Sequence, residues 1–177
     1  MDLRAFFELG QAVATSPAPA IGDRLWRHLG SRLPATAFVL YVYDAQDDTL
    51  VPIYASASIG AHERMDRIPL GERLSGWVAA TGQTVMNSDA RLDLDEPARE
   101  HSRLRSALAV PITASERLTG VFSFYAEASN AFSDSHRRFV EAAGKAIARS
   151  MPQIVLDFAP QVGDDDGCHN GARVLRK

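Results

Sequence analysis

The sequence holds a single cysteine, Cys168, among 177 residues, so it cannot form an internal disulfide. It has no apolar run of about eighteen residues, the length that a membrane-spanning helix requires. It also lacks a charged start followed by an apolar stretch and a small-residue cleavage site. These absences argue against a disulfide-stapled secreted scaffold and against a membrane partner. We expect a cytoplasmic protein.

An excess of charge of one sign is absent as well. The 19 Lys and Arg residues are interspersed with 22 Asp and Glu residues, which gives a net charge of -3. Because no broad positive field results, we expect no nucleic-acid partner.

The histidines do not have the spacing of a metal site. No two of the five stand two to five residues apart, as ligands on one helix or strand face would. A haem would need one of two isolated histidines, His62 or His101, as its axial ligand. We expect no metal site, and the sequence implies no particular cofactor. The five are His28, His62, His101, His136 and His169.

Sequence motifs typical of a catalytic site are missing too. Ser75 and Ser123 have no histidine at motif distance, and the Asp run at 164–166 is typical of a solvated surface. We therefore predict a protein that is not an enzyme.

The composition is that of an ordinary globular domain, with 46% hydrophobic and 23% charged residues, enough for one core. Apolar residues at helical spacing predict helices over 3–14 and 22–31. A long final helix begins after Ser133, a good N-cap, and Pro152 kinks or ends it. From residue 157 onward the sequence has no periodicity and predicts a linker-like tail.

Two β-hairpins are predicted between the helices. Residues 37–44, AFVLYVYD, lack polar alternation, which predicts a strand buried on both faces. A polar turn connects it to 49–57. The short connection ASER joins 106–113 to 118–127, and RIPL and TVMN are predicted as further short strands.

A short helix stands before TVMN. Ser75 is predicted as its N-cap and Gly82 as the residue that ends it, because glycine enters the left-handed region without a steric penalty. A helix of about two turns is unstable alone in water, so we expect Trp77, Val78 and Ala79 to pack against a sheet as a lid.

These elements predict an α+β fold with a central antiparallel sheet of about six strands. The terminal helices lie on one face, and the lid helix and loops cover a pocket on the other. By the period of two, Val39, Tyr41 and Tyr43 point toward that pocket.

The segment 88–105 is the longest irregular stretch inside the predicted domain. Such stretches are often binding loops, and its four arginines could reach an anionic ligand at the mouth of the pocket. The interpretation that we favour is a solvated face that they form with the acidic residues between them. The arginines are Arg91, Arg99, Arg103 and Arg105, and the acids are Asp93, Asp95, Glu96 and Glu100.

Three stretches together resemble a GAF domain: IPLGERLSGWVAATGQTVMNSDAR, LRSALAVPI and LTGVFSFYAEASNAFSDSHRRFVEAAGKAIA. The resemblance covers residues 3–151. It implies a regulatory module related to PAS domains, with a domain over 1–155 and a flexible tail over 156–177. It also implies a homodimer through the first and last helices, and a small ligand of unknown identity between sheet and lid.

The residues separate this chain from three branches of that family. The cyclic-nucleotide branch carries Asn-Lys and Asp-Glu pairs where this chain has Ala126-Glu127 and His136-Arg137, and only Phe132 matches. The bilin-binding branch places its cysteine before the second hairpin, whereas Cys168 and His169 stand in the tail. The methionine-sulfoxide reductases of the family depend on several cysteines.

Two functions remain open. One is a sensor that binds a small ligand and signals through its terminal helices. The other is a ligand-free dimerisation or interaction module whose pocket its own side chains fill. The residues predicted to line the pocket are Val39, Tyr41, Tyr43, Ala55, Leu74, Ser75, Val78, Arg103 and Ser123.

Overall fold

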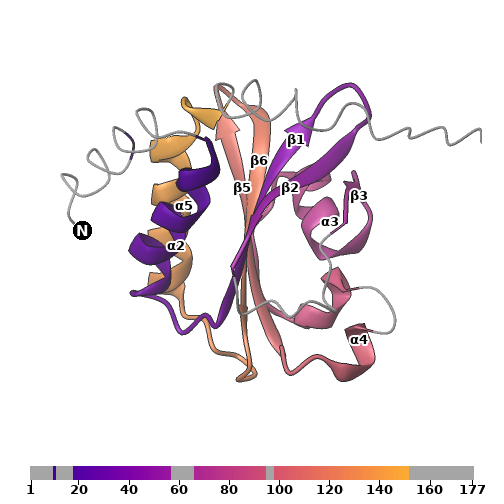
Figure 1. The fold of residues 1–177 in the computed structure, drawn as a ribbon, viewed down its shortest axis with the longest axis vertical. Helices are drawn as coiled ribbons and strands as arrows, with labels where there is room; N and C mark the ends of the chain where they lie inside the picture. Colours follow the sequence, from indigo (N-terminus) through magenta and orange to yellow (C-terminus); the bar gives the residue numbers. More distant parts are fainter. Residues whose placement is uncertain (1–9, 11–17, 57–65, 95–97, 152–177) are drawn as a thin grey trace, which may run out of the picture.

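A computed structural model of the chain describes residues 10, 18–56, 66–94 and 98–151. Its centre is a six-stranded antiparallel sheet with the strand order β3-β2-β1-β6-β5-β4. Two helices cover one face, and a short helix with its neighbouring loops covers the other (Figure 1). In chain order the elements are α2 (Ala18–Gly30), β1 (Ala37–Asp44), β2 (Thr49–Ala55), β3 (Ile68–Pro69), α3 (Arg73–Thr81), β4 (Val85–Ser88), the 3-10 helix η1 (Ala90–Asp93), α4 (Ala98–His101), β5 (Ser106–Ala114), β6 (Arg117–Ala126) and α5 (Asp134–Ile147).

Both predicted hairpins are confirmed. β1 pairs with β2 and β5 with β6, and the two hairpins join where β1 pairs with β6 at the middle of the sheet. The β5–β6 turn places Ser115 and Glu116 at φ 48° and 65°. Two successive residues with a left-handed backbone conformation are typical of two-residue hairpin turns, because the twist of such a turn matches that of the flanking strands.

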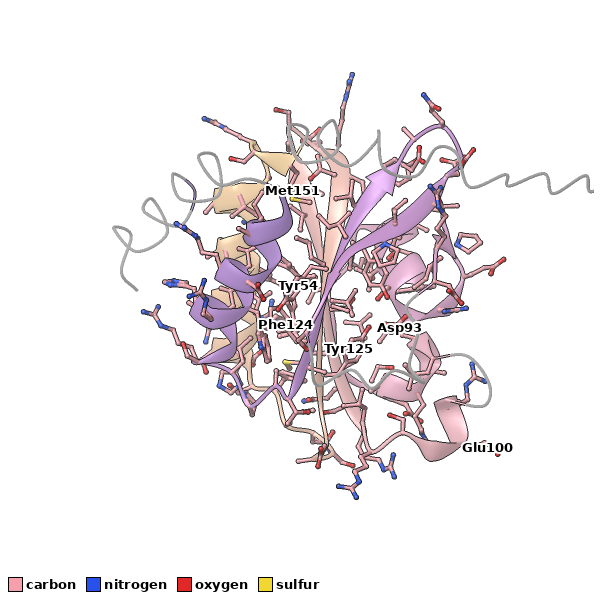
Figure 2. The ribbon with its side chains drawn as sticks, in the orientation of Figure 1. Tyr54, Asp93, Glu100, Phe124, Tyr125 and Met151 are labelled. Atoms are coloured by element: carbon pink, nitrogen blue, oxygen red, sulfur yellow. The ribbon has the colours of Figure 1, made fainter. Side chains whose placement is uncertain are left out.

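The face of the sheet toward α2 and α5 is built from large aromatic side chains. The rings of Phe38 and Phe124 stack with centroids 4.6 Å apart, and Trp26 of α2 stacks on Phe38 at 5.9 Å. Figure 2 shows Phe124 and Met151 on this helix side of the sheet. The helices predicted over 22–31 and after Ser133 form this layer, and Ser133 is the N-cap of α5 as predicted.

The opposite face is covered by α3, and its core combines large side chains, Tyr41 and Tyr125 among them, with small ones. Val39 and Tyr41 of β1 are fully buried there, in the same core as Ala107 and Ala109 of β5. Phe38, Leu40 and Val42 alternate with them and belong to the helix-side core. The prediction that β1 is buried on both faces is therefore confirmed.

Two predictions about the lid helix are wrong. Ser75 is not its N-cap, because α3 begins at Arg73, with Glu72 in the cap position and making no side-chain cap bond. Trp77 is 42% exposed, because it lies on the side of α3 that turns away from the sheet, whereas Val78 and Ala79 are buried. Gly82 does end the helix, with φ 66°, as predicted.

Several predictions concern residues outside the described ranges. They include the helix over 3–14 except Gly10, the tail over 156–177 and the domain limits at 155 and 156, which stay predictions. Gly10 is helical, and a Cβ added to it would lie 3.1 Å from the backbone oxygen of Ala146 on α5. Among the described residues, no helix is both long and apolar enough to cross a membrane.

Candidate functional site

Asp93 lies at the end of η1, between the lid helix and the sheet, and its exposed fraction is 0%. Figure 2 shows it on the side of the sheet opposite Phe124. The prediction that this carboxyl belongs to a solvated face is therefore wrong. Leu92 beside it is 47% exposed, because the 3-10 helix turns Leu92 outward and Asp93 inward.

Three donors bind the Asp93 carboxylate. The backbone N–H of Ser75 donates to Oδ1 at 2.7 Å, and the Ser75 hydroxyl donates to Oδ2 at 2.7 Å. The Tyr125 hydroxyl of β6 also donates to Oδ2, at 2.9 Å. All three donors are uncharged, and they come from the lid helix and from a central strand.

The hydrogen bonds continue into the sheet. The hydroxyl oxygens of Ser75 and Ser123 lie 2.6 Å apart, and Ser123 donates when the Ser75 proton is committed to Asp93. Tyr41 forms a side-chain hydrogen bond with Tyr125. We call these five side chains the Asp93 cluster, and each is fully buried: Asp93, Ser75, Ser123, Tyr125 and Tyr41.

Burial controls the protonation of the cluster. It raises the pKa of Asp93 above its usual range, and the three donors offset this rise only in part. Burial also raises the pKa values of Tyr41 and Tyr125, and the neighbouring Asp93 charge raises both further. Both phenols therefore stay protonated at neutral pH and keep a proton to donate.

Asp93 also caps the lid helix. Ser75 is the third residue of α3, so its N–H is one of the first-turn amides that have no partner inside the helix. The side chain of Glu72 makes no capping hydrogen bond. The carboxylate of Asp93, which belongs to η1, accepts the bond from the Ser75 N–H instead. A negative group at a helix N-terminus is also favoured by the helix dipole.

The structure brings together six of the nine residues predicted to line the pocket. Ser75 and Ser123 bond directly, with Tyr41 in the same cluster. Val39, Leu74 and Val78 are buried around them, with exposed fractions of 0%, 7% and 0%.

The other three lie outside the Asp93 cluster, although Tyr43 packs against the core beneath α3. The hydroxyl of Tyr43 donates to Oδ1 of Asp48 at 2.5 Å, at the β1–β2 turn. Ala55 is exposed at the end of β2, although it pairs with Val39, and Arg103 is exposed.

Three arginines of the irregular segment bind that segment itself. Arg91 pairs with Asp89 at 2.6 Å, and Arg99 donates to the backbone oxygens of Arg91 and Leu94. Arg105 donates to the backbone oxygen of Ser102 at 2.7 Å. They stabilise the path of the loop that carries Asp93.

Sequence reasoning missed two members of the cluster. Tyr125 stands two residues after Ser123 on β6, so the period of two could have placed both on the lid face. For Asp93 the sequence carries no such signal, because its charged surroundings are typical of a surface loop.

Other polar groups lie away from this site. In the described part of the chain, no three His, Cys, Asp or Glu side chains are arranged to hold a metal ion. His136 accepts a bond from the backbone N–H of Ser133 and so caps α5. A hollow of about 400 Å³ lies on α2, on the opposite side of the sheet, lined by Arg24, Arg27 and His28.

Comparison with known families decides what this architecture is. The family model of the GAF domain matches residues 18–151, which include every strand, both covering helices and the Asp93 cluster. This chain belongs to the GAF domain family. GAF domains are in general sensory or regulatory domains.

Solved GAF structures share the fold at low sequence identity. The GAF domain of a phosphoenolpyruvate-protein phosphotransferase from Coxiella burnetii aligns with a TM-score of 0.71 and 20% identity, over 89% of this chain and 96% of that one. The corresponding Acinetobacter domain gives 0.65 and 17%, over 93% and 97%.

An enzyme is also among the similar structures. The free methionine-R-sulfoxide reductase of Neisseria meningitidis, solved with its substrate, aligns with a TM-score of 0.65 and 22% identity, over 86% of this chain and 89% of that one. No curated protein matches the sequence. These likenesses show the GAF fold, which is shared by regulatory domains and by an enzyme.

Proposed function

We propose that this GAF domain is a non-enzymatic sensor that binds a small molecule between the sheet and the lid helix. The observation that carries the proposal is the Asp93 cluster. It places an ionisable group and four hydroxyls at the centre of an interface otherwise lined by apolar side chains. A buried ionisable group with a strongly shifted pKa is a candidate for a functional site.

The position of the cluster supports a signalling role. It connects η1, the lid helix and the central strands β1 and β6, so a molecule that enters there changes contacts in all of them. A ligand acts on a conformational equilibrium only by binding one state better than the other. Here the two states differ in the contacts that η1 makes with the lid helix and the sheet.

A second function is favoured by the complete burial of the same cluster. All five side chains are fully buried, and Asp93 already satisfies the donors of Ser75 and Tyr125. In this reading the domain needs no ligand, and its function is dimerisation or another protein contact.

The non-enzymatic assignment rests on the groups at the site. The cluster consists of hydroxyls and one carboxyl, whereas the reductases of the family depend on several cysteines. The described residues include no cysteine, and Cys168 lies beyond them.

Native mass spectrometry of the full chain tests the sensor proposal. We expect the purified protein to carry a small molecule that Ser123→Ala loses, because this change removes a hydroxyl from the cluster. Ser106→Ala is the matched control: Ser106 is an equally buried strand serine, but it donates to the backbone oxygen of Ala128 instead. Protein that carries no adduct, and whose melting temperature no small molecule raises, favours the ligand-free module.

We further propose that the signal passes to a second copy through the terminal helices. Ala142 and Ala146 of α5 and Trp26 of α2 are only partly buried against the core and offer apolar surface on this layer. Small residues allow helices to approach closely.

A further inference from the structure

We propose that the site between sheet and lid takes a small molecule bearing a carboxylate, and that Asp93 is the built-in competitor that occupies the carboxylate position in the absence of that molecule. This inference rests on the ligand-binding function proposed above. It names the class of the ligand and the way in which binding is regulated.

The donors around Asp93 already form a carboxylate site. The N–H and hydroxyl of Ser75 and the hydroxyl of Tyr125 bind its two oxygens at 2.7, 2.7 and 2.9 Å. Ser123 supports the Ser75 hydroxyl from behind at 2.6 Å. The two 2.7 Å distances from Ser75 are those of charge-assisted hydrogen bonds, in which an ionised acceptor strengthens the bond.

The donors and the carboxylate that they bind come from different parts of the chain. The donors belong to α3 and β6, whereas the carboxylate belongs to η1, a four-residue 3-10 helix in the connection between β4 and α4. The donors can therefore keep their positions on α3 and β6 while the occupant is exchanged. This separation makes Asp93 replaceable by a carboxylate that is not part of the chain.

The chemistry of the site disfavours a cationic ligand. A backbone N–H can only donate, and Ser75 directs it at the bound oxygen, so a cationic amine would face a donor of the wrong polarity. Apolar side chains of Val39, Leu74 and Val78 surround the donors and suit a small apolar body attached to the carboxylate.

Competition by Asp93 has two consequences. An occupant tethered in the same chain has a high effective concentration, so a free carboxylate binds more weakly than the donors alone would allow. When the free carboxylate wins, Asp93 must leave the N-terminus of α3. Binding is thereby coupled to a displacement of η1, which could serve as the signal.

Chemical rescue tests the proposal with acetate, which has the same carboxylate and methyl carbon as the side chain of Asp93. Asp93→Ala should melt below the unmodified chain, and sodium acetate at constant ionic strength should raise its melting temperature in a concentration-dependent way. Acetamide, the neutral isostere, should not. Asp47→Ala, which removes an exposed carboxylate at the β1–β2 turn, should show no rescue.

A second variant covers the case in which Asp93→Ala does not fold. Asp93→Asn keeps the shape of the side chain but competes less well for the donors. Propionate should therefore bind this variant at least about tenfold more tightly than the unmodified chain. The amide signal of Ser75 in NMR measures this binding. Equal or weaker binding by the variant overturns the role of Asp93 as competitor.

The outcomes separate this inference from the sensor proposal. If acetate and propionate have no effect while the purified chain carries a molecule without a carboxylate, the ligand class is wrong and the sensor function stands. If neither variant responds and no molecule co-purifies, both proposals fail.

Discussion

The hydroxyl of Ser75 on the lid helix lies 2.6 Å from the hydroxyl of Ser123 on the central strand β6, and both side chains are fully buried. This contact joins the lid to the sheet directly. It also orients the Ser75 hydroxyl toward Asp93. When Ser123 donates its proton to the Ser75 oxygen, the Ser75 proton stays directed at the carboxylate.

The two serines should be energetically coupled. Ser75→Ala removes a hydrogen bond to a charged group and should lower the free energy of unfolding by about 1.5–3 kcal/mol, whereas Ser123→Ala should cost about 0.5–1.5 kcal/mol. The double variant should cost less than the sum, because both changes break the same bond. Urea unfolding measures all three, and Ser31→Ala, which changes an exposed serine directly after α2, serves as the control. Strictly additive losses would show that the hydroxyl pair contributes nothing.

The raised pKa of Asp93 makes stability depend on pH. A carboxyl whose native pKa is raised contributes stability that is fully present below its unfolded pKa of 3.8 and is lost as the pH rises through the native pKa. Asp93→Asn lacks this titration. The unfolding free energy of Asp93→Asn minus that of the unmodified chain should therefore increase from about pH 4 to about pH 7.5.

The charged and titratable groups around Asp93 do not disturb this comparison. Tyr41 on β1 and Tyr125 on β6 stay protonated over this range because burial raises their pKa values, and the nearby charge of Arg73 on α3 is present in both proteins. Denaturant unfolding at several pH values gives the difference. A difference that is constant or decreases with pH contradicts the raised pKa.

Gly120 should be intolerant of any side chain. A Cβ at this position would lie 2.3 Å from the backbone oxygen of Tyr41 and 3.0 Å from Cε of Met151, in the central strand pair. Gly120→Ala should destabilise the fold by about 1–3 kcal/mol or more. Gly144→Ala in α5 is the matched control, because its nearest contact would be 3.8 Å away. Removing a helical glycine should stabilise by about 0.5–1 kcal/mol. Thermal unfolding compares them, and equal effects would contradict the close approach.

We expect cAMP and cGMP to bind weakly or not at all. The positions that would form the Lys-to-Asp connection of the cyclic-nucleotide branch hold Ala126, Glu127, His136 and Arg137. In the structure His136 caps α5, and Arg137 pairs with Asp134 and Glu141. Isothermal calorimetry tests this. A dissociation constant near or below ~1 μM, which corresponds to about -8 kcal/mol, would show that binding does not need that signature.

The proposed dimer should depend on salt and on Phe6 and Phe7 of the predicted first helix. Arg24 and Arg27 on α2 and Arg32 just after it are exposed, so two like faces repel each other and the dimer should strengthen as salt screens them. Replacing both phenylalanines by polar residues should shift the protein toward monomer, since burying one Phe stabilises by about 1.5–3 kcal/mol. Analytical ultracentrifugation decides it. An unmodified chain that is monomeric at ~100 μM in low and high salt contradicts the proposal.

Local pattern in the sequence was enough for most of the elements. The strand β1 is predicted by an unbroken run of β-branched and aromatic residues, and its two faces follow from the period of two. Ser133 and Gly82 mark the start of α5 and the end of α3 through their own backbone chemistry. Such signals act between residues that are neighbours in the chain, so the sequence alone determines them.

Only the tertiary structure decided the site. The position of Ser75 before an apolar run predicts an N-cap, but its hydroxyl bonds partners 18 and 48 residues away, and Tyr125 reaches Asp93 across 32 residues. Asp93 stands among charged residues that indicate a surface loop. It is buried because the fold places the unfilled first-turn amide and the hydroxyl of Ser75 beside the hydroxyl of Tyr125, and a carboxylate can satisfy these three donors together. No local pattern encodes that convergence, since it exists only once α3 lies on the sheet.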